Sequence, residues 1–248
     1  MAQGPSSEHA RLIRKLETIA VLSDRERAAL AELPLRLKSF RENTDLIQPG
    51  DAPTECCLII DGLVCRYKLT GTGQRRQIMS LHLPGDIPDL QSLHLGVMDH
   101  SLLSLTTGRA AYMTHVAMRE LTDRFPIITK AFWRDSLIDA AVAREWLCGI
   151  GRRSAHQRLA HIICEVFVRS RALHLIEEKT FEFSMTQAEL GDSLGLSTVH
   201  VNRVLQDLRR DELVTWRGNS ILVLDWARLR VAGDFDPGYL HLLDGAIL

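Results

Sequence analysis

The sequence predicts an α+β protein with a β-rich first half, a long central helix and a winged helix-turn-helix near its end. Three observations support this fold class. Short apolar runs alternate with glycine-containing turns over residues 35–113, a pattern typical of an antiparallel sandwich or barrel. A helical stretch without proline or an early glycine follows Pro126. Two helical segments joined by a glycine turn then precede a hairpin pattern over residues 185–224.

Composition narrows the class of protein before any motif is considered. Of the 248 residues, 46% are hydrophobic and 25% charged, the profile of a soluble globular chain with a substantial core. The formal net charge of −1 excludes a protein that binds nucleic acid through a large net positive charge alone. Neither a secretory signal nor an apolar stretch long enough to cross a membrane is visible, so we expect a cytoplasmic protein without membrane contact.

The first 125 residues predict an effector-type β domain preceded by short helices. Over residues 9–33 the pattern is helical, and Ser23 with Glu26 has the spacing of a capping box. The clearest strand patterns are Cys57–Ile60, Leu63–Tyr67, Gln77–Leu83 and Leu102–Thr106. The turns between them are marked by Pro49–Asp51, Asp61–Gly62 and Pro84–Asp86.

Residues 126–150 predict one helix of about 36 Å, since each residue adds 1.5 Å along the axis. Its apolar residues cover more than one stripe, so the helix requires two partners that bury it. We expect one partner to be the β domain and the other to be the same helix of a second subunit. The alternative is a central core helix of a monomer. The residues predicted to form the dimer contact are Ile127, Ala131, Ile138, Ala141 and Val142.

A domain boundary is expected at Gly151–Arg153, which interrupts the helical pattern. Ser154 and Gln157 then have capping-box spacing and start a helix that reaches about Ser170. The expected order is therefore a β domain with N-terminal helices at 1–125, a dimerisation helix at 126–150, a winged helix-turn-helix at 151–230 and a tail at 231–248. The apolar content of the tail predicts that it docks on the body or on a partner subunit.

Residues 185–213 carry the functional motif. Thr186 and Glu189 form a third capping box, Gly195 supplies the tight turn, and Ser197 caps a second helix. The small residue Gly191 and the aliphatic Val201 stand where a helix-turn-helix needs close packing. A hairpin over residues 213–224 with a Gly-Asn turn completes the wing.

The outer face of the second helix predicts contact with double-stranded DNA. Arg203 suits the O6 and N7 acceptors of guanine, Asn202 or His200 suits bases or phosphates, and Val199 suits a thymine methyl. Arg209 and Arg210, one turn further on, suit phosphates or the helix C-terminus. The predicted DNA-contacting residues are Thr186, Ser197, Thr198, Val199, His200, Asn202, Arg203, Arg209 and Arg210.

With these motifs the chain resembles the cyclic-AMP receptor/FNR (Crp/Fnr) family of bacterial transcription regulators along nearly its whole length. The segments that resemble the family most are Leu194–Ser197 and Val201–Leu205. The resemblance implies a β-roll of the cyclic-nucleotide-binding, jelly-roll type, a homodimer through the long helix, and palindromic DNA sites read in successive major grooves. It also implies contact with RNA polymerase if the protein is an activator.

The chain departs from the family at the residues that would hold an effector. Members that bind cyclic nucleotide carry Gly-Glu and later Arg-Ser or Arg-Thr, whereas this chain has Asp89-Leu90 and His100-Ser101. We therefore expect no useful affinity for cyclic AMP or cyclic GMP. The first cysteine is Cys56, so the N-terminal cysteine cluster that holds the FNR iron–sulfur group is missing. The recognition helix departs too, with Val199 where many members have Glu.

No cofactor or metal site is predicted, and the effector stays unknown. Five cysteines without a C-x-x-C pair predict free thiols, and the histidines of the β domain, at 82, 94, 100 and 115, are scattered. No nucleophile elbow, P-loop or dinucleotide-binding motif is present, so we expect no enzyme. Two other hypotheses remain open: a small-molecule or redox sensor that acts mainly through protein contacts, and a cupin-like metal enzyme.

Overall fold

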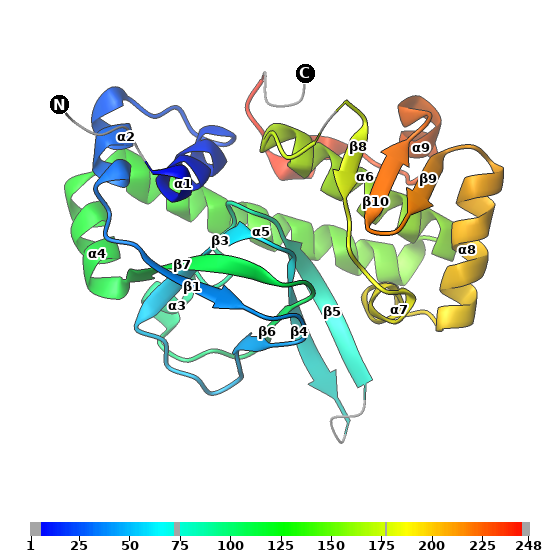
Figure 1. Cartoon of the computed structure of the whole chain (residues 1–248), viewed down its shortest axis with the longest axis horizontal. Helices are drawn as coiled ribbons and strands as arrows, with labels where there is room; N and C mark the ends of the chain where they lie inside the picture. Colours follow the sequence, from blue (N-terminus) through cyan, green and yellow to red (C-terminus); the bar gives the residue numbers. More distant parts are fainter. Residues whose placement is uncertain (1–5, 72–74, 177, 245–248) are drawn as a thin grey trace. The chain divides into compact units, whose positions relative to one another are not determined.

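The computed structural model describes residues 6–71, 75–176 and 178–244. Figure 1 follows the chain from its N-terminal helices to the C-terminal segment. The chain packs into two compact units, one made of residues up to 67 with 81–140 and one made of 68–80 with 141–248. The predicted fold class is confirmed, because a β-rich half, a long helix and a winged helix-turn-helix follow one another.

Two small antiparallel sheets lie in the β-rich half of the chain. One has the strand order β1-β7-β3, and the other has the order β2-β6-β4-β5. Leu58 pairs with Ala111 in the first sheet, and Val64 pairs with Ser104 in the second. The strands are β1 (Arg36–Phe40), β2 (Asp45–Ile47), β3 (Glu55–Asp61), β4 (Val64–Thr70), β5 (Arg75–His82), β6 (Ser101–Ser104) and β7 (Gly108–Thr114).

Helices cover the outer face of the sheet that contains β3. They are α1 (Ser7–Glu17), α2 (Asp24–Ala31), α3 (Ser92–Leu95), α4 (His115–Arg124) and the first part of α5 (Pro126–Arg152). Alternate residues of β3 pack in opposite directions: Cys56 and Leu58 join a core with these helices, while Cys57 and Ile59 join a core with residues of the second sheet. Burial of both faces explains why β3 is a continuous apolar run rather than an alternating pattern.

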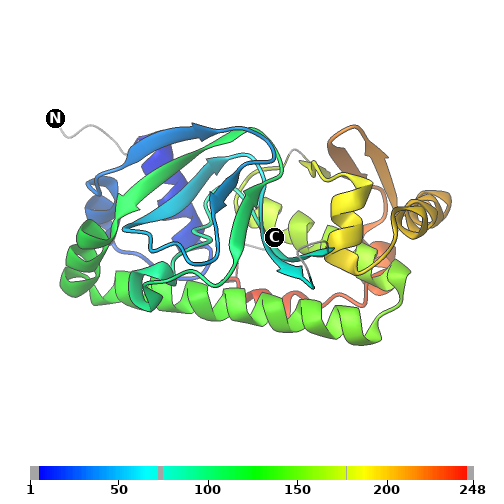
Figure 2. The same ribbon diagram turned by 90° about the horizontal axis from the view of Figure 1, so that it is seen from below.

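Helix α5 extends two residues beyond the predicted end and starts at Pro126, as expected of a proline at the first helical position. Figure 2 shows it as one unbroken helix. Of the five residues predicted for a dimer contact only Ile127 is exposed, because Ala131, Ile138, Ala141 and Val142 are buried within the chain itself. Those four residues pack against other segments of the same chain, and the predicted dimer contact stays a prediction. The large apolar residues of α5 that are exposed are Ile127, Trp133, Leu137, Leu147 and Ile150.

The second unit combines helices with a three-stranded sheet of order β8-β10-β9. All the predicted caps form here: Ser154 with Gln157 and Thr186 with Glu189 make reciprocal capping boxes. The elements are α6 (Ala155–Ala172), β8 (Thr180–Glu182), α7 (Gln187–Leu194), α8 (Thr198–Arg210), β9 (Val214–Arg217), β10 (Ser220–Val223), α9 (Trp226–Ala232) and the 3₁₀ turn η1 (Pro237–Leu240).

The tail after α9 docks on its own chain. Phe235 and Leu240 are buried, and Phe235 packs edge-on against His161 of α6 with ring centroids 5.1 Å apart. The last four residues of the predicted tail, 245–248, lie outside the described part of the chain. For the described part of the tail, the body of the same unit is therefore the docking surface.

Candidate nucleic-acid interface

Helices α7 and α8 form a helix-turn-helix whose ends are set by local hydrogen bonds. The Thr186 hydroxyl accepts from the Glu189 amide at 3.2 Å, and the Glu189 carboxylate accepts from the Thr186 amide at 2.7 Å. Gly195 turns the chain in a left-handed conformation with φ of 66°, which a side chain disfavours. The Ser197 hydroxyl then accepts from the His200 amide at 3.3 Å and opens α8.

The two helices approach closely because of one glycine and one aliphatic face. A Cβ at Gly191 would lie 2.6 Å from the carbonyl oxygen of Leu196, a distance that real Cβ atoms do not reach. Val201, Val204, Leu205 and Leu208 are all buried beneath α8. This packing confirms the predicted helix-turn-helix and leaves the opposite face of α8 to the solvent.

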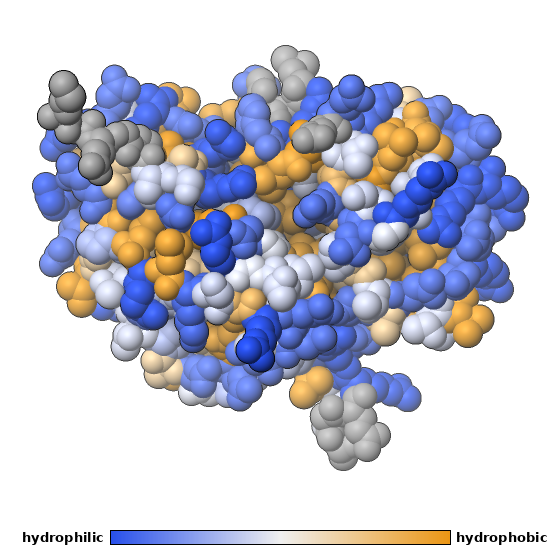
Figure 3. Space-filling model, viewed as in Figure 1, coloured by the Kyte–Doolittle hydropathy of each residue, from blue (hydrophilic) through white to orange (hydrophobic). Residues whose placement is uncertain are grey.

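The N-terminal part of that outer face carries the groups predicted to read bases. Val199 is 79% exposed, Thr198, Asn202 and Arg203 are exposed, and His200 is half-buried. Among the described residues Arg203 makes no ion pair. Figure 3 shows the outer side of the α8 region as mostly hydrophilic. The Arg203 guanidinium on the outer face of α8 is therefore free for the type of bidentate contact that arginine makes with guanine.

The two arginines at the end of α8 are placed differently. Arg209 donates to the carbonyl oxygen of Trp216 in β9 at 2.8 Å, so it ties the helix to the wing. Arg210 is exposed and forms ion pairs with Asp207 at 2.9 Å and Asp211 at 3.6 Å. Both arginines therefore have partners within the domain, and a phosphate would compete with those partners.

Gln187, the first residue of α7, is a candidate interface residue that the sequence analysis did not identify. The amide nitrogen of Asn202 donates to the Gln187 side-chain oxygen at 3.3 Å. This contact links the start of the first helix to the outer face of the second through the Gln187 side-chain oxygen and does not use the Gln187 amide nitrogen, which is a donor. Its position directly after the capping residue Thr186 was the available signal.

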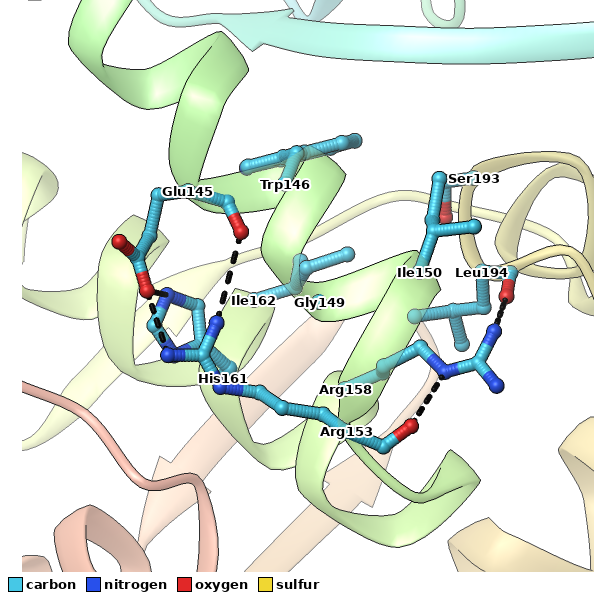
Figure 4. Close-up of a pocket in the computed structure, with 10 residues that line it drawn as sticks. All are labelled: Glu145, Trp146, Gly149, Ile150, Arg153, Arg158, His161, Ile162, Ser193 and Leu194. Atoms are coloured by element: carbon cyan, nitrogen blue, oxygen red, sulfur yellow. Dashed lines mark hydrogen bonds and ion pairs between the residues drawn. The ribbon is translucent and has the colours of Figure 1, made fainter.

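Arg158 of α6 is a second residue that sequence reasoning missed. Figure 4 shows its guanidinium at the end of α7, where it donates to the Leu194 carbonyl oxygen. It also donates to the Arg153 carbonyl oxygen at 3.1 Å. Because the last carbonyl groups of a helix have no partner within it, Arg158 both caps α7 and joins it to α6.

The predicted hairpin forms from β9 and β10, and β8 adds a third strand beside β10. Ile221 of β10 pairs with Trp216 of β9 on one side and with Phe181 of β8 on the other. The turn between β9 and β10 is exposed, and Gly218 takes a φ of 55° there. Arg217 stands at the exposed base of this turn, a position suited to a phosphate contact.

Comparison with known proteins connects this motif to the β-rich half. Residues 157–232 match the Crp-like helix-turn-helix domain, and residues 37–125 match the cyclic nucleotide-binding domain. The transcriptional activator protein FnrL of Cereibacter sphaeroides is 28% identical over 225 residues that span 88% of each chain. The chain belongs to the Crp/Fnr family of transcription regulators. It is thus a DNA-binding regulator, and α8 is the second helix of its helix-turn-helix.

Other relatives agree with this assignment. The fumarate and nitrate reduction regulatory protein of Vibrio cholerae is 22% identical over 208 residues, which cover 84% of this chain and 82% of that one. The solved structure of FixK2 from Bradyrhizobium japonicum superposes with a TM-score of 0.69 at 20% identity and covers 81% of this Crp/Fnr regulator and 98% of FixK2. At that identity the superposition shows a shared fold.

The β-rich half of this Crp/Fnr regulator contains an arginine that sequence reasoning overlooked. Arg66 of β4 donates to the imidazole of His100 at 3.1 Å, to the Pro88 carbonyl oxygen at 2.7 Å and to Asp139 of α5 at 2.7 Å. Its side chain is only 12% exposed. Each nitrogen of the guanidinium has a partner within the chain, and the three partners come from separate segments.

Asp89, which replaces the family's Gly-Glu, is also turned inward. It is fully buried, and its Oδ1 accepts from the Cys57 amide of β3 at 2.8 Å. Loss of solvation raises the pKa of this carboxyl to about 7, an effect that the Cys57 hydrogen bond offsets in part. Burial and the neighbouring Arg66 lower the pKa of His100.

Asp86 has a structural role as well. Its carboxylate pairs with Lys15 of α1 at 2.7 Å and accepts from the Leu83 amide at 2.7 Å. Lys15 also pairs with Asp135 of α5 at 3.2 Å. Because burial dominates there, the pKa of the Asp135 carboxyl is raised. This ion-pair cluster joins α1, the loop after β5 and α5.

Further features of the described residues are the geometry of metal-ligating side chains, the cysteines and the hydropathy of the helices. Within residues 6–71, 75–176 and 178–244, no group of three or more His, Cys, Asp or Glu side chains is arranged to hold a metal ion. Cys56, Cys57, Cys65 and Cys164 are buried free thiols and Cys148 is an exposed one. No helix in the described part of the chain is both long and apolar enough to cross a bilayer.

Proposed function

We propose that this regulator binds palindromic DNA as a homodimer joined through α5. The observation that carries the proposal is a row of exposed residues on α5 at alternating spacings of four and three, the spacing of a coiled-coil seam. The row consists of Trp133, Leu137, Ala140, Arg144 and Leu147. Leu137 is 56% exposed and Leu147 70%.

This row replaces the dimer residues expected from sequence alone. Three of the five residues, Trp133, Leu137 and Leu147, are large, apolar and exposed, and a second copy of α5 offers a matching row. Arg144 stands at a core position of the seam, where one polar residue sets register and lowers stability. Two chains joined along α5 would present two copies of α8, as two-fold symmetric DNA sites require.

Within each half-site we propose that Arg203 reads a guanine and Val199 a thymine methyl. Asn202 is held by Gln187, so its carbonyl oxygen is the part available to a base amino group. Thr186, Ser197, Thr198 and His200 lie around the helix ends, where backbone phosphates approach. We propose that Arg209 and Arg210 contact phosphates. To do so, Arg209 must release the Trp216 carbonyl oxygen and Arg210 its two aspartates.

We further propose that neither cyclic nucleotide nor an FNR-type iron–sulfur cluster controls this protein. The residues present do not fit a cyclic nucleotide, since Asp89 is bound to a strand amide and Arg66 has a partner at each nitrogen. His100 stands where an arginine would meet the cyclic phosphate, and it accepts from Arg66. For the cluster, four of the five cysteines are buried in the packed interior, and the fifth, Cys148, stands alone on α5.

The dimer proposal is tested with Leu137→Asp, which places a charge in the seam. Analytical ultracentrifugation should show a monomer, and gel-shift titration should show loss of preference for a palindrome over a single half-site. The control is Val21→Asp, since Val21 is 81% exposed and lies outside α5. A Leu137→Asp protein that remains a dimer and keeps its palindrome preference would exclude α5 as the interface.

The effector proposal is tested by isothermal titration calorimetry of the full chain with cyclic AMP and with cyclic GMP. We expect no heat of binding up to millimolar nucleotide. Binding in the micromolar range would show that the buried polar network rearranges around a ligand, and the proposal would then be wrong.

A further inference from the structure

One buried carboxylate joins α5, α6 and the tail. Glu165 of α6 is completely buried, and its Oε2 accepts from the Tyr239 hydroxyl at 2.8 Å and from the Trp146 indole nitrogen at 3.0 Å. Its Oε1 pairs with Arg169 at 3.2 Å. A buried carboxylate is stable only when donors surround it, so these contacts hold the three segments together.

A histidine of α6 binds the tail at a second point. The Nδ1 of His161 lies 3.1 Å from the Gly233 carbonyl oxygen and donates to it, and its Nε2 lies 3.1 Å from the Tyr239 hydroxyl. The His161 and Tyr239 rings stack with an interplanar angle of 15°. A Cβ at Gly233 would lie 2.8 Å from the His161 amide nitrogen, so the tail backbone rests directly on α6.

The junction between α5 and α6 is tied to the same tail. Arg153, the residue between the two helices, donates to Asp234 Oδ2 at 3.3 Å and to the Asp234 carbonyl oxygen at 3.3 Å. Its guanidinium also pairs with Glu145 of α5, as Figure 4 shows. The junction residue therefore connects the last turns of α5 with the start of the tail.

Packing beside this junction is incomplete. A pocket of about 20 Å³ lies there, enough for about one water molecule. Figure 4 shows that residues of α5, α6 and the end of α7 line it, among them Trp146, Ile162 and Leu194. The polar contacts of the tail therefore lie beside a part of the α5–α6 junction that side chains do not fill completely.

We propose that residues 233–240 are a clamp that fixes the direction of α6 relative to the last turns of α5. The inference rests on the proposed function, in which α5 joins the dimer and α8 reads DNA, because this direction then sets the separation of the two recognition helices. Tyr239 and Asp234 are positioning residues in this scheme and do not contact DNA. The clamp lies beyond residue 232, where the match to the Crp-like helix-turn-helix domain ends.

The test measures affinity for palindromes whose half-site spacing varies by one or two base pairs, and for a single half-site. Tyr239→Phe removes the hydroxyl bonds and keeps the ring. We expect about a tenfold loss at the best spacing, a flatter dependence on spacing and an unchanged half-site affinity. Asp234→Asn, on a side chain that is 68% exposed, should change the profile in the same direction by a smaller factor and without risk to folding.

Tyr67→Phe is the matched control, because the Tyr67 hydroxyl also donates to a carboxylate, Asp45 Oδ1 at 3.0 Å, in the first unit. It should leave the spacing profile unchanged. The clamp is overturned if both tyrosine variants act alike, or if Tyr239→Phe and Asp234→Asn keep the wild-type profile. A wild-type protein without any spacing preference would instead refute the palindromic dimer, and the clamp with it.

Discussion

The side chains around Arg66 form hydrogen bonds with one another inside the protein, whereas those on the outer face of α8 face the solvent. Around Arg66 the donors and acceptors are buried and bind one another across β4, the loop after β5 and α5. On α8 the side chains of Val199 and Arg203 stand in solvent. A saturated buried cluster stabilises a fold, whereas exposed groups on a rigid helix remain available to a ligand. In this regulator the groups around Arg66 are bound to one another within the fold, whereas those on the outer face of α8 are accessible.

The largest effect should come from breaking the buried cluster. Arg66→Met keeps the side-chain stem but removes the hydrogen bonds that Arg66 donates to His100, Asp139 and the Pro88 carbonyl oxygen. We expect the free energy of unfolding to fall by about 2–3 kcal/mol, which lowers Tm by about 4–12 °C in thermal unfolding. Arg109→Met removes an exposed ion pair with Asp61 and should change Tm little. Equal effects would show that burial of the cluster contributes nothing.

Next in size is the loss of base reading. Arg203→Ala should reduce affinity for the preferred site by about 1–3 kcal/mol and relax the preference at one base pair. Selection from randomised half-sites followed by titration measures both. Arg210→Ala should weaken binding slightly and equally on all sequences, because Arg210 is already paired with Asp207 and Asp211. Uniform weakening by Arg203→Ala would assign that residue to phosphate instead.

A smaller effect concerns the pH dependence of stability. The folded pKa of Asp89 is raised to about 7 from 3.8, so the folded chain holds this proton more tightly than the unfolded chain. Its contribution to stability is complete below pH 3.8 and is lost as pH rises through 7. Asp89→Asn keeps the acceptor for the Cys57 amide, so it should raise Tm more at pH 8 than at pH 5. An equal Tm change at both values would mean that Asp89 is already charged at pH 5.

The smallest effect tests the link between the two helices of the motif. Gln187→Ala and Asn202→Ala should each weaken binding, and the double variant should lose less than the sum of the two. A double-mutant cycle in DNA titration should give a coupling of about 0.5 kcal/mol. Strict additivity would show that the 3.3 Å contact does not position Asn202 on DNA.

Features that depend on neighbours along the chain were predictable from sequence. The capping boxes at Ser23, Ser154 and Thr186 all form, and Gly195 adopts the left-handed turn. A cap joins groups three residues apart, so its spacing in the sequence almost determines its geometry. The apolar stripe beneath α8 was predictable for the same reason, since helical periodicity places it on one face.

Features that depend on contacts between distant segments of the chain were not predictable from the sequence. Periodicity shows that α5 has two apolar faces without showing which face its own chain covers. It therefore did not reveal that Ala131, Ile138 and Val142 are buried within the chain. Arg66 meets Asp139 across 73 positions of sequence. Tyr239 meets Glu165 across 74. No pattern of neighbouring residues in the sequence predicts such long-range pairs.

The sequence by itself therefore determined the class of this protein: the order of its elements, the helix-turn-helix and the residues offered to bases all follow from spacings of one to four positions. Only the tertiary structure decided which polar groups form hydrogen bonds inside the chain, which face of α5 is exposed and where the tail packs. The physical reason is that burial is a property of the packed chain. A side chain loses its contact with water only when segments far apart in the sequence close over it.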